Sequence, residues 1–269
     1  WFDGRLAIKL GQIEGDINFN ILGSADFFIN GTWGWLGSWS ANLPGSGPTY
    51  PNPVPAVQLI LRPVPEWTFQ AAVFNGSPTG NDPEGNANGL RFPIGQGALT
   101  FLEFTYEPDV AQEASLPHAY KLGAWYHSGR FDRFTTSVDG QPLAADQDEP
   151  LPNRVSGNYA LYASLDYPLW YDSDTRSRGL NLFGTLTINP QGDRNIANGL
   201  IDGGLAYTGL FQGRPLDRTG LGFTWLNMSP DYADYIRTID HTGVADFAIP
   251  SHEAFLELTH QAVIRPWLK

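Results

Sequence analysis

The chain lacks cysteine altogether and is poor in charged residues. The absence of Cys excludes disulfides, thiolate metal sites and a cysteine nucleophile. Charged residues make up 16% of the 269 residues, below the roughly 25% of an ordinary soluble domain. The net charge of -12 and the lack of any Lys/Arg run argue against a nucleic-acid partner, because no basic surface would meet the phosphates. Glycine and aromatic residues, in contrast, are abundant, with 30 Gly, 16 Phe, 11 Tyr and 9 Trp.

Long hydrophobic runs are missing too. No stretch approaches the roughly 20 apolar residues of a transmembrane helix, which excludes a helical membrane protein. The opening "WFDGRLAIKL" does not have the layout of a signal peptide. Because the chain starts and ends in strand-like sequence, we interpret residues 1–269 as one domain that is incomplete at both ends.

Motifs for metal binding or catalysis are absent. The acidic stretches "YDSDTRS" and "ADQDEP", which include Asp172, Asp174, Asp146, Asp148 and Glu149, do not follow EF-hand spacing. No H-E-x-x-H pair and no G-x-S-x-G elbow occurs. We therefore predict no cofactor, no metal and no enzymatic activity. A soluble all-β glycoside hydrolase, which needs only a pair of carboxylates, and a sugar-binding β module stay open as alternatives.

The strongest pattern is an alternation of apolar with polar or small residues. In "YKLGAWYH", for example, Leu122 and Tyr126 fall on one parity, while Lys121, Trp125 and His127 fall on the other. Helical periodicity is nearly absent, so the pattern predicts half-buried antiparallel strands. The segments are 5–12, 56–62, 67–74, 98–107, 119–128, 157–167, 179–188, 200–210, 218–226 and 253–264.

The connections between these segments alternate in length. Long stretches (13–55, 75–97, 129–156 and 227–252) alternate with shorter ones such as "PVPE" at 63–66. This asymmetry is typical of an antiparallel up-and-down transmembrane β-barrel, with its apolar parity facing lipid and its polar parity facing a wet lumen. Aromatic residues near the strand ends favour membrane interfaces over a soluble β-sandwich, the alternative. They are Trp67, Phe69, Tyr106, Tyr126, Tyr167, Trp170, Tyr207, Phe211 and Trp225.

Several stretches resemble the carbohydrate-selective porins of the OprB family. The similar text is "DGRLAIKLGQIEGDINF", "KLGAWYHSGRFD", "GNYALYASLDYPLW", "GLNLFGTLTINPQGDRN", "DGGLAYTGLFQGR", "TGLGFTWLNMS" and "EAFLELTHQAVIRPWL". The resemblance implies a barrel of about sixteen strands, with roughly four before residue 1 and about two after residue 269. It further implies selective passive diffusion of sugars across a Gram-negative outer membrane, contact with lipid and lipopolysaccharide, and leaves a homotrimer open.

The polar parity supplies candidate pore-lining and sugar-binding residues. Sugars offer hydroxyls to polar groups and ring faces to aromatic side chains, so a mixed wall can replace their water shell. The predicted set is Arg5, Lys9, Arg62, Glu103, Lys121, Trp125, His127, Asp166, Asp202, Arg218 and Glu257. Trp125 either stacks on a pyranose or holds a loop that folds over it. On a wet lumen wall, Ala160 or Thr105 should tolerate Arg, whereas outward Leu161 or Phe104 should not.

The stretch 13–55 is long and aromatic, which is unusual for a plain hairpin loop. Two interpretations stay open. The stretch folds inward and narrows the channel, or it packs on the rim by its own tryptophans as an external loop. The candidates for the constriction are Phe27, Asn30, Trp33, Trp35 and Trp39.

Overall fold

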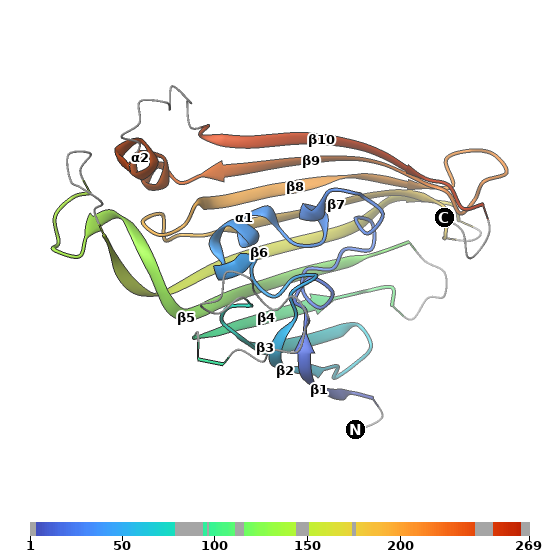
Figure 1. Ribbon diagram of the computed structural model, residues 1–269. Coiled ribbons are helices and arrows are strands. Elements are labelled where there is room, and N and C mark those ends of the chain that lie inside the picture. Colours follow the sequence, from blue (N-terminus) through green and yellow to red (C-terminus); the bar gives the residue numbers. More distant parts are fainter. Residues whose placement is uncertain are drawn as a thin grey trace.

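A computed structural model describes residues 4–78, 94–95, 97–110, 116–143, 151–173, 176–239 and 250–264. Its ten strands form one antiparallel sheet in chain order (Figure 1), which confirms the predicted meander. The strands are β1 Leu6–Ile13, β2 Val54–Leu61, β3 Trp67–Asn75, β4 Ala98–Tyr106, β5 Ala119–Ser137, β6 Pro152–Tyr171, β7 Gly179–Ile188, β8 Ala197–Thr208, β9 Arg218–Met228 and β10 His252–Gln261. Four short helical elements accompany them: η1 Gly31–Trp33, α1 Gly37–Asn42, η2 Pro44–Ser46 and α2 Pro230–Ile239.

The strand bounds agree closely with the alternation, and β7 has the same bounds as predicted. The largest disagreement is the predicted connection 129–156, because β5 runs on to Ser137 and β6 already begins at Pro152. A register shift between His127 and Arg130 interrupts the alternation there. An extra residue in one strand changes which face the following side chains take, so the strand continues while its period does not.

The connections differ in length at the two ends of the sheet, as the sequence predicts. At one end lie 14–53, 76–97, 138–151, 189–196 and 229–251, and at the other 62–66, 107–118, 172–178 and 209–217. We refer to these as the long-loop end and the short-turn end. Such an asymmetry is a feature of outer-membrane barrels.

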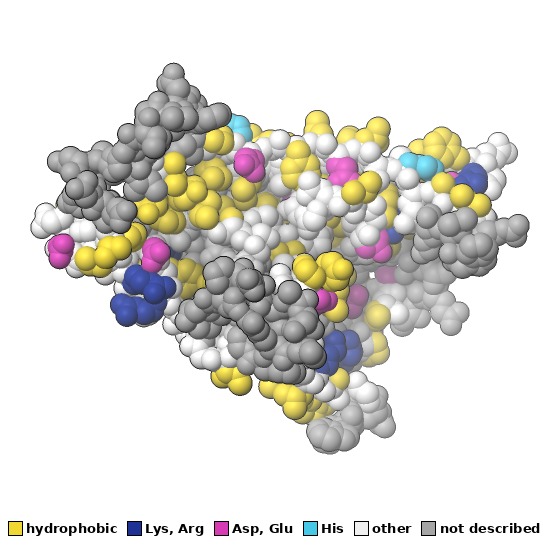
Figure 2. All heavy atoms as spheres, in the orientation of Figure 1, with side chains coloured by type: hydrophobic (Ala, Val, Ile, Leu, Met, Phe, Trp, Pro, Cys, Tyr) yellow, Lys and Arg dark blue, Asp and Glu magenta, His cyan; other side chains and the backbone are white. Residues whose placement is uncertain are grey.

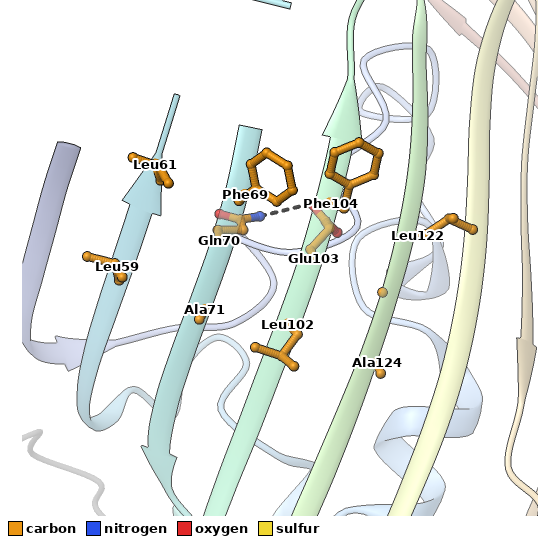
Figure 3. A pocket seen from close by; sticks show the side chains of 11 residues that line it. Leu59, Leu61, Phe69, Gln70, Ala71, Leu102, Glu103, Phe104, Leu122 and Ala124 are labelled. Atoms are coloured by element: carbon orange, nitrogen blue, oxygen red, sulfur yellow. Dashed lines mark hydrogen bonds between the residues drawn. The ribbon is translucent and has the colours of Figure 1, made fainter. Parts of the chain in front are cut away.

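The outer face of the sheet carries the apolar parity. Leu122 is 61% exposed and Leu161 46% exposed, so the predicted direction of this parity is correct. Figure 3 shows this face over β2–β5, where Leu59, Leu61, Phe69, Leu102, Phe104 and Leu122 surround a shallow depression of about 530 Å³. An apolar surface of this kind is compatible with lipid and not with water.

Aromatic side chains mark both ends of this outer face. At the short-turn end Trp67 stacks on Tyr106, with ring centroids 4.3 Å apart, and Tyr106 stacks on Tyr120. Toward the long-loop end Tyr126 and Tyr159 lie opposite each other on β5 and β6. The distance from Tyr120 to Tyr126 along β5 is about 20 Å. The aromatic residues thus border the apolar face at both ends, as they do at the two membrane interfaces of a barrel in lipid.

The inner face is covered by residues 14–53, which we call the inner segment. Figure 1 shows the segment, in blue, lying across one face of the sheet. On this face Ala160, which packs in a cluster with the segment, is 0% exposed, and Thr105 is 4% exposed. The expectation that the inner parity is wet at these positions, and would tolerate Arg, is therefore wrong. These inner-face positions are buried, although the alternation alone predicted contact with water.

Two regions of packing join the inner segment to the sheet. In the first, the aromatic region, Trp39 and Phe19 of the segment contact Phe101 of β4, and Trp125 and Tyr162 belong to the same cluster.

In the second, the glycine region, Phe27, Phe28 and Trp33 of the segment lie against Gly220 and Gly222 of β9. A Cβ on Gly222 would approach Trp33 Cζ2 to 2.5 Å, so the bare backbone of β9 is what admits the rings.

Helix α2 follows β9 at the long-loop end. The Ser229 hydroxyl accepts the Tyr232 N–H, and Pro230 occupies the first helical position. Tyr232 and Tyr235 of the helix pack against Phe134 of β5. The prediction that helical structure is nearly absent missed this helix, although Ser-Pro is a helix-start signal. None of the described helices is long and apolar enough to cross a membrane.

Candidate pore wall and inner segment

Glu103 of β4 is the centre of a buried polar cluster on the inner face. Its carboxylate accepts the Asn20 backbone N–H at 2.6 Å and the Tyr162 hydroxyl at 2.8 Å. Gln70 Nε2 donates to it at 2.8 Å and Lys121 Nζ lies 3.2 Å away. The Thr105 hydroxyl also donates to it at 3.3 Å. The side chain of Glu103 has no exposed surface, so its charge depends on such partners for compensation. Glu103 thus connects the inner segment to the sheet, and Lys121 joins β5 to β4 beside it.

Gly123 of β5 makes this arrangement possible. It lies directly opposite Tyr162 in the register of β5 and β6. A Cβ at Gly123 would fall 2.1 Å from Tyr162 Cζ, so the tyrosine ring lies flat over the glycine backbone. The ring position carries the Tyr162 hydroxyl to Glu103.

Asp166 of β6 binds the inner segment farther along. It accepts the Ser24 N–H at 2.8 Å and the Ser24 hydroxyl at 2.6 Å, while Asn181 donates at 2.7 Å. Asp202 of β8 is 5% exposed and accepts the Thr185 N–H at 3.1 Å. Asp166 therefore holds the segment, and the Asp202 bond lies within the sheet.

Glu257 of β10 accepts bonds from one short stretch of the inner segment. Its two oxygens take the backbone N–H of Ile29 at 2.6 Å, that of Asn30 at 3.1 Å and the Trp33 indole N–H at 2.9 Å. A carboxylate that faces several N–H donors forms stronger bonds than a neutral acceptor would. Glu257 thus fixes the turn that leads into η1.

Arg218 of β9 holds the segment from the same side. Its guanidinium pairs with Asp26 and donates to the Gly23 carbonyl at 2.6 Å. It also lies 4.2 Å from the centroid of the Phe27 ring. These contacts combine charge pairing with a cation–π contact.

Trp125 of β5 lies beneath the inner segment, and His127 lies beside Gly76 at the end of β3. Each is 1% exposed. His127 Nε2 donates to the Gly76 carbonyl at 2.6 Å, and Nδ1 accepts the Gly129 N–H at 2.9 Å. The Trp125 ring belongs to the aromatic region, and its indole N–H has no partner among the described residues. A sugar would reach Trp125 only after the segment had moved, so the packing alternative accounts for its position.

Arg5, Lys9 and Arg62 lie apart from the rest of the predicted set. All three are exposed, at β1 and the adjoining turn. Lys9 Nζ donates to Asn18 at 2.7 Å, and the Arg62 N–H donates to the Arg5 carbonyl at 2.7 Å. Among the described residues, no contact links these three side chains to Lys121 or to Arg218.

The constriction candidates divide by burial. Phe27, Trp33 and Trp35 are 7%, 7% and 5% exposed, so they hold the segment against the sheet. Trp39 is 0% exposed. Asn30 is exposed and its side chain caps η1 by accepting the Thr32 N–H. Asn30 is therefore the candidate that faces away from the packing.

Sequence reasoning missed several polar partners of the segment. Asn42 Nδ2 donates to the Ala197 carbonyl at 2.8 Å, and its Oδ1 accepts the Ala197 N–H at 3.0 Å. Asn20 and Tyr162 complete the cluster around Glu103. No periodicity marks a loop residue that bonds to a strand far along the chain, so Asn20 and Asn42 carried no sequence signal. The acidic residues Asp146, Asp148, Glu149 and Asp174 lie outside the described residues.

Glu14 and Asp193, which lie outside the strands, have shifted pKa values. Burial, reinforced by the nearby Asp16, raises the pKa of Glu14 at the start of the inner segment. At Asp193, burial acts to raise the pKa, but hydrogen bonds from Arg194 and Arg133 outweigh it and lower the pKa. The Arg133–Asp193 pair, 2.6 Å apart, joins β5 to the connection between β7 and β8.

The apolar outer face, the aromatic bands and the long loop folded over the inner face define an outer-membrane β-barrel of the porin class. The chain belongs to the carbohydrate-selective porin family OprB, whose model matches residues 1–269. The bacterial outer membrane is therefore its location.

Individual relatives agree with this assignment. The chain is 27% identical over 266 residues to Porin B of Pseudomonas aeruginosa, covering 97% of this chain and 56% of that protein. In fold it matches the high pH structure of Pseudomonas putida OprB with a TM-score of 0.82, at 23% identity, covering 97% of this chain and 61% of that one. The chain thus spans a little over half the length of these relatives.

Proposed function

We propose that the complete protein is a channel for the selective passive diffusion of sugars across the outer membrane. The observation that carries the proposal is the division of the sheet into an apolar outer face and an inner face rich in carboxylates, amides and aromatic rings. Sugars exchange water for such groups at little cost, and a passive channel needs only weak contacts. Membership of the carbohydrate-selective porin family supports a channel rather than an enzyme.

The inner segment is proposed to narrow this channel. Its bonds to Glu103, Asp166 and Glu257 support a fixed position against the wall. Several residues then shape the pore indirectly, because they lie under the segment or bind it: Glu103, Asp166, Arg218, Glu257 and Trp125. Exposed Lys9 and Asn30 are the residues proposed to meet solute.

The outer face is proposed to contact membrane lipid, with lipopolysaccharide at the long-loop end. The exposed Leu122 and Leu161 support the lipid contact. A homotrimer stays a prediction from the resemblance.

The experiment is conductance of the full-length protein in planar bilayers with and without sugars. We expect stepwise ion currents that a permeating sugar reduces in a saturable manner. Ion steps without any sugar effect, together with no sugar uptake in liposome swelling, would contradict sugar selectivity. Release of reducing sugar from a glycan would instead support the glycoside-hydrolase alternative.

A further inference from the structure

Two exposed arginines lie on strands β5 and β6, beyond the aromatic band of the long-loop end. They are Arg130 of β5 and Arg154 of β6. Nearer the apolar band, Tyr126 lies opposite Tyr159. At about 3.3 Å per residue, Arg130 lies at most about 13 Å beyond Tyr126. Figure 2 shows basic side chains, in dark blue, gathered over this end of β5 and β6.

Both arginines belong to the outer face of the sheet. Phe131, the residue after Arg130, is buried and packs edge-on against the ring of His127, which is on the inner face. Side chains alternate between the faces along a strand, so Arg130 and Asp132 point outward. Arg154 lies opposite Asp132 in the register and therefore shares this face.

Reciprocal hydrogen bonds hold the two guanidiniums over the same stretch of the hairpin. Arg130 Nη2 donates to the Arg154 carbonyl, and Arg154 Nη2 donates to the Arg130 carbonyl, both at 3.2 Å. Like charges on one face repel each other, and Arg154 is offset by Asp132 at 3.0 Å. Arg130 pairs with no carboxylate among the described residues. The pair therefore carries a positive charge that no described side chain neutralises.

The neighbouring charges add to this excess. Arg194, in the connection between β7 and β8, donates to the Gly157 carbonyl at 2.7 Å and shares Asp193 with Arg133. The described stretches 130–133, 154–157 and 193–194 thus hold four arginines and two aspartates. The whole chain, in contrast, has a net charge of -12. A local excess of positive charge on an acidic protein favours an anionic partner.

Tyr126 and Tyr159 lie between the arginines and the apolar band, and both are exposed. Gly157 has a φ of +85°, which favours glycine, and a Cβ there would lie 3.2 Å from the Tyr126 hydroxyl. The glycine thus keeps the space beside this hydroxyl open. From the membrane outward the surface presents leucine at Leu161, then tyrosine hydroxyls, then guanidiniums. This order suits an amphipathic lipid with a phosphate in its headgroup.

We propose that Arg130 and Arg154 bind a phosphate group of lipopolysaccharide in the outer leaflet. The guanidinium fork matches phosphate oxygens two at a time, and its hydrogen bonds to an anion are stronger than neutral ones. The proposal rests on the proposed contact with lipopolysaccharide at the long-loop end and names the site of that contact. The lipid then lies on the face of β5 and β6 that is opposite to the channel.

The test is the affinity of the full-length protein in detergent for lipid A, the phosphorylated anchor of lipopolysaccharide. Arg130→Gln/Arg154→Gln removes both charges, so the dissociation constant should rise about 10- to 100-fold. Arg130→Lys/Arg154→Lys keeps the charges and loses the fork, so its affinity should lie between the two. Lipid A stripped of its phosphates should bind the wild-type protein as weakly as intact lipid A binds the Gln variant. Inorganic phosphate should not displace the lipid, because it has no acyl chains.

The matched control is Arg237→Gln on α2. The side chain of Arg237 is 59% exposed and that of Arg154 58%, and each pairs with an aspartate. Unchanged affinity in the Gln double variant would overturn the site, and so would an equal loss in Arg237→Gln.

The remaining outcomes separate the site from the functions on which it rests. Equal wild-type binding of intact and stripped lipid A would overturn phosphate recognition and leave the lipid contact standing. A wild-type protein that binds no lipid A would overturn the lipid contact as well. A changed oligomeric state of the Gln variant at unchanged lipid affinity would assign the arginines to a second copy of the chain. Sugar-dependent conductance should be the same in all variants, so the channel is tested separately.

Discussion

In the aromatic region, bulky side chains come from both the inner segment and the strands, whereas in the glycine region they come largely from the segment. Trp39 meets Phe101 and Tyr162 ring against ring, with centroids 5.3 and 4.9 Å apart. Phe28 and Trp33 instead fit onto strand positions that lack a side chain. The first region therefore depends on large side chains that fill the volume between segment and sheet. The second depends on glycines whose missing side chains leave room for the rings. Removing atoms should damage one, and adding atoms should damage the other.

Trp39→Ala should have the largest effect on the docking of the segment. Trp39 is fully buried, so its truncation leaves a cavity worth about 3–5 kcal/mol. The measurement is amide exchange of residues 14–53 in the full-length protein in detergent. Tyr50→Ala, at a position 77% exposed, is the control and should change little. Equal loosening of the Phe28–Trp33 stretch would show that the two regions open as one unit, which would break the comparison.

Gly222→Val should come next and act through the opposite cause. The added atoms overlap Trp33 and Phe28, at a cost of about 1–3 kcal/mol. The same exchange experiment should show protection lost first around Phe28 and Trp33. Replacing the Trp33 indole by a smaller side chain in Gly222→Val/Trp33→Leu should restore part of this protection. Gly31→Ala, where a Cβ meets nothing within 4 Å, should have no effect. A double variant with less protection than Gly222→Val alone would contradict the explanation that Gly222 leaves room for the Trp33 ring.

Glu257→Gln should weaken the glycine region by about 1 kcal/mol, because a neutral amide replaces the charge that accepts three N–H groups. Proteolysis of folded full-length protein near Asn30 should become faster. Trp39 and its surroundings should stay protected. Glu253→Gln on the same strand is the matched control. Cleavage at unchanged rate would mean that ring packing alone holds this turn.

The smallest effect should be that of acidification on the Asp193 ion pairs, which lie outside both regions. The lowered pKa of Asp193 means that its ion pairs stabilise the folded state above the unfolded value of about 3.9, and that this contribution is lost as pH falls below that value. The loss should be at most about 1 kcal/mol for such partly exposed pairs. Amide exchange of residues 133–137 should rise below pH 4. Asp193→Asn should remove the pH dependence, and a dependence that persists would assign it to other groups.

The sheet was largely predictable because its signals are local. Alternation with a period of two and clusters of turn residues placed β7 at Gly179–Ile188 and gave the length asymmetry of the connections. The extension of β5 past His127 was hidden because a bulge shifts the face of every later residue.

The site was less predictable than the sheet. Parity correctly directed Glu103, Asp166 and Glu257 inward, but it carried no information on what they would meet. Their partners Asn20, Ser24 and Ile29 come from a loop without periodicity. Whether a polar inner wall faces water or a folded loop is decided by contacts distant in sequence, which no local pattern reports.

The long-range bonds of the inner segment also set an order of assembly. Ile29 and Glu257 are 228 positions apart in the chain, and Ser24 and Asp166 are 142 apart. The backbone N–H groups of Ser24 and Ile29 gain these acceptors only once β6 and β10 have formed. We expect the inner segment to be the last described element to acquire protection from amide exchange during refolding into detergent. Contacts between residues so far apart in the sequence form slowly. Until then Phe28 and Trp33 also lack the glycine backbone of β9 on which they pack.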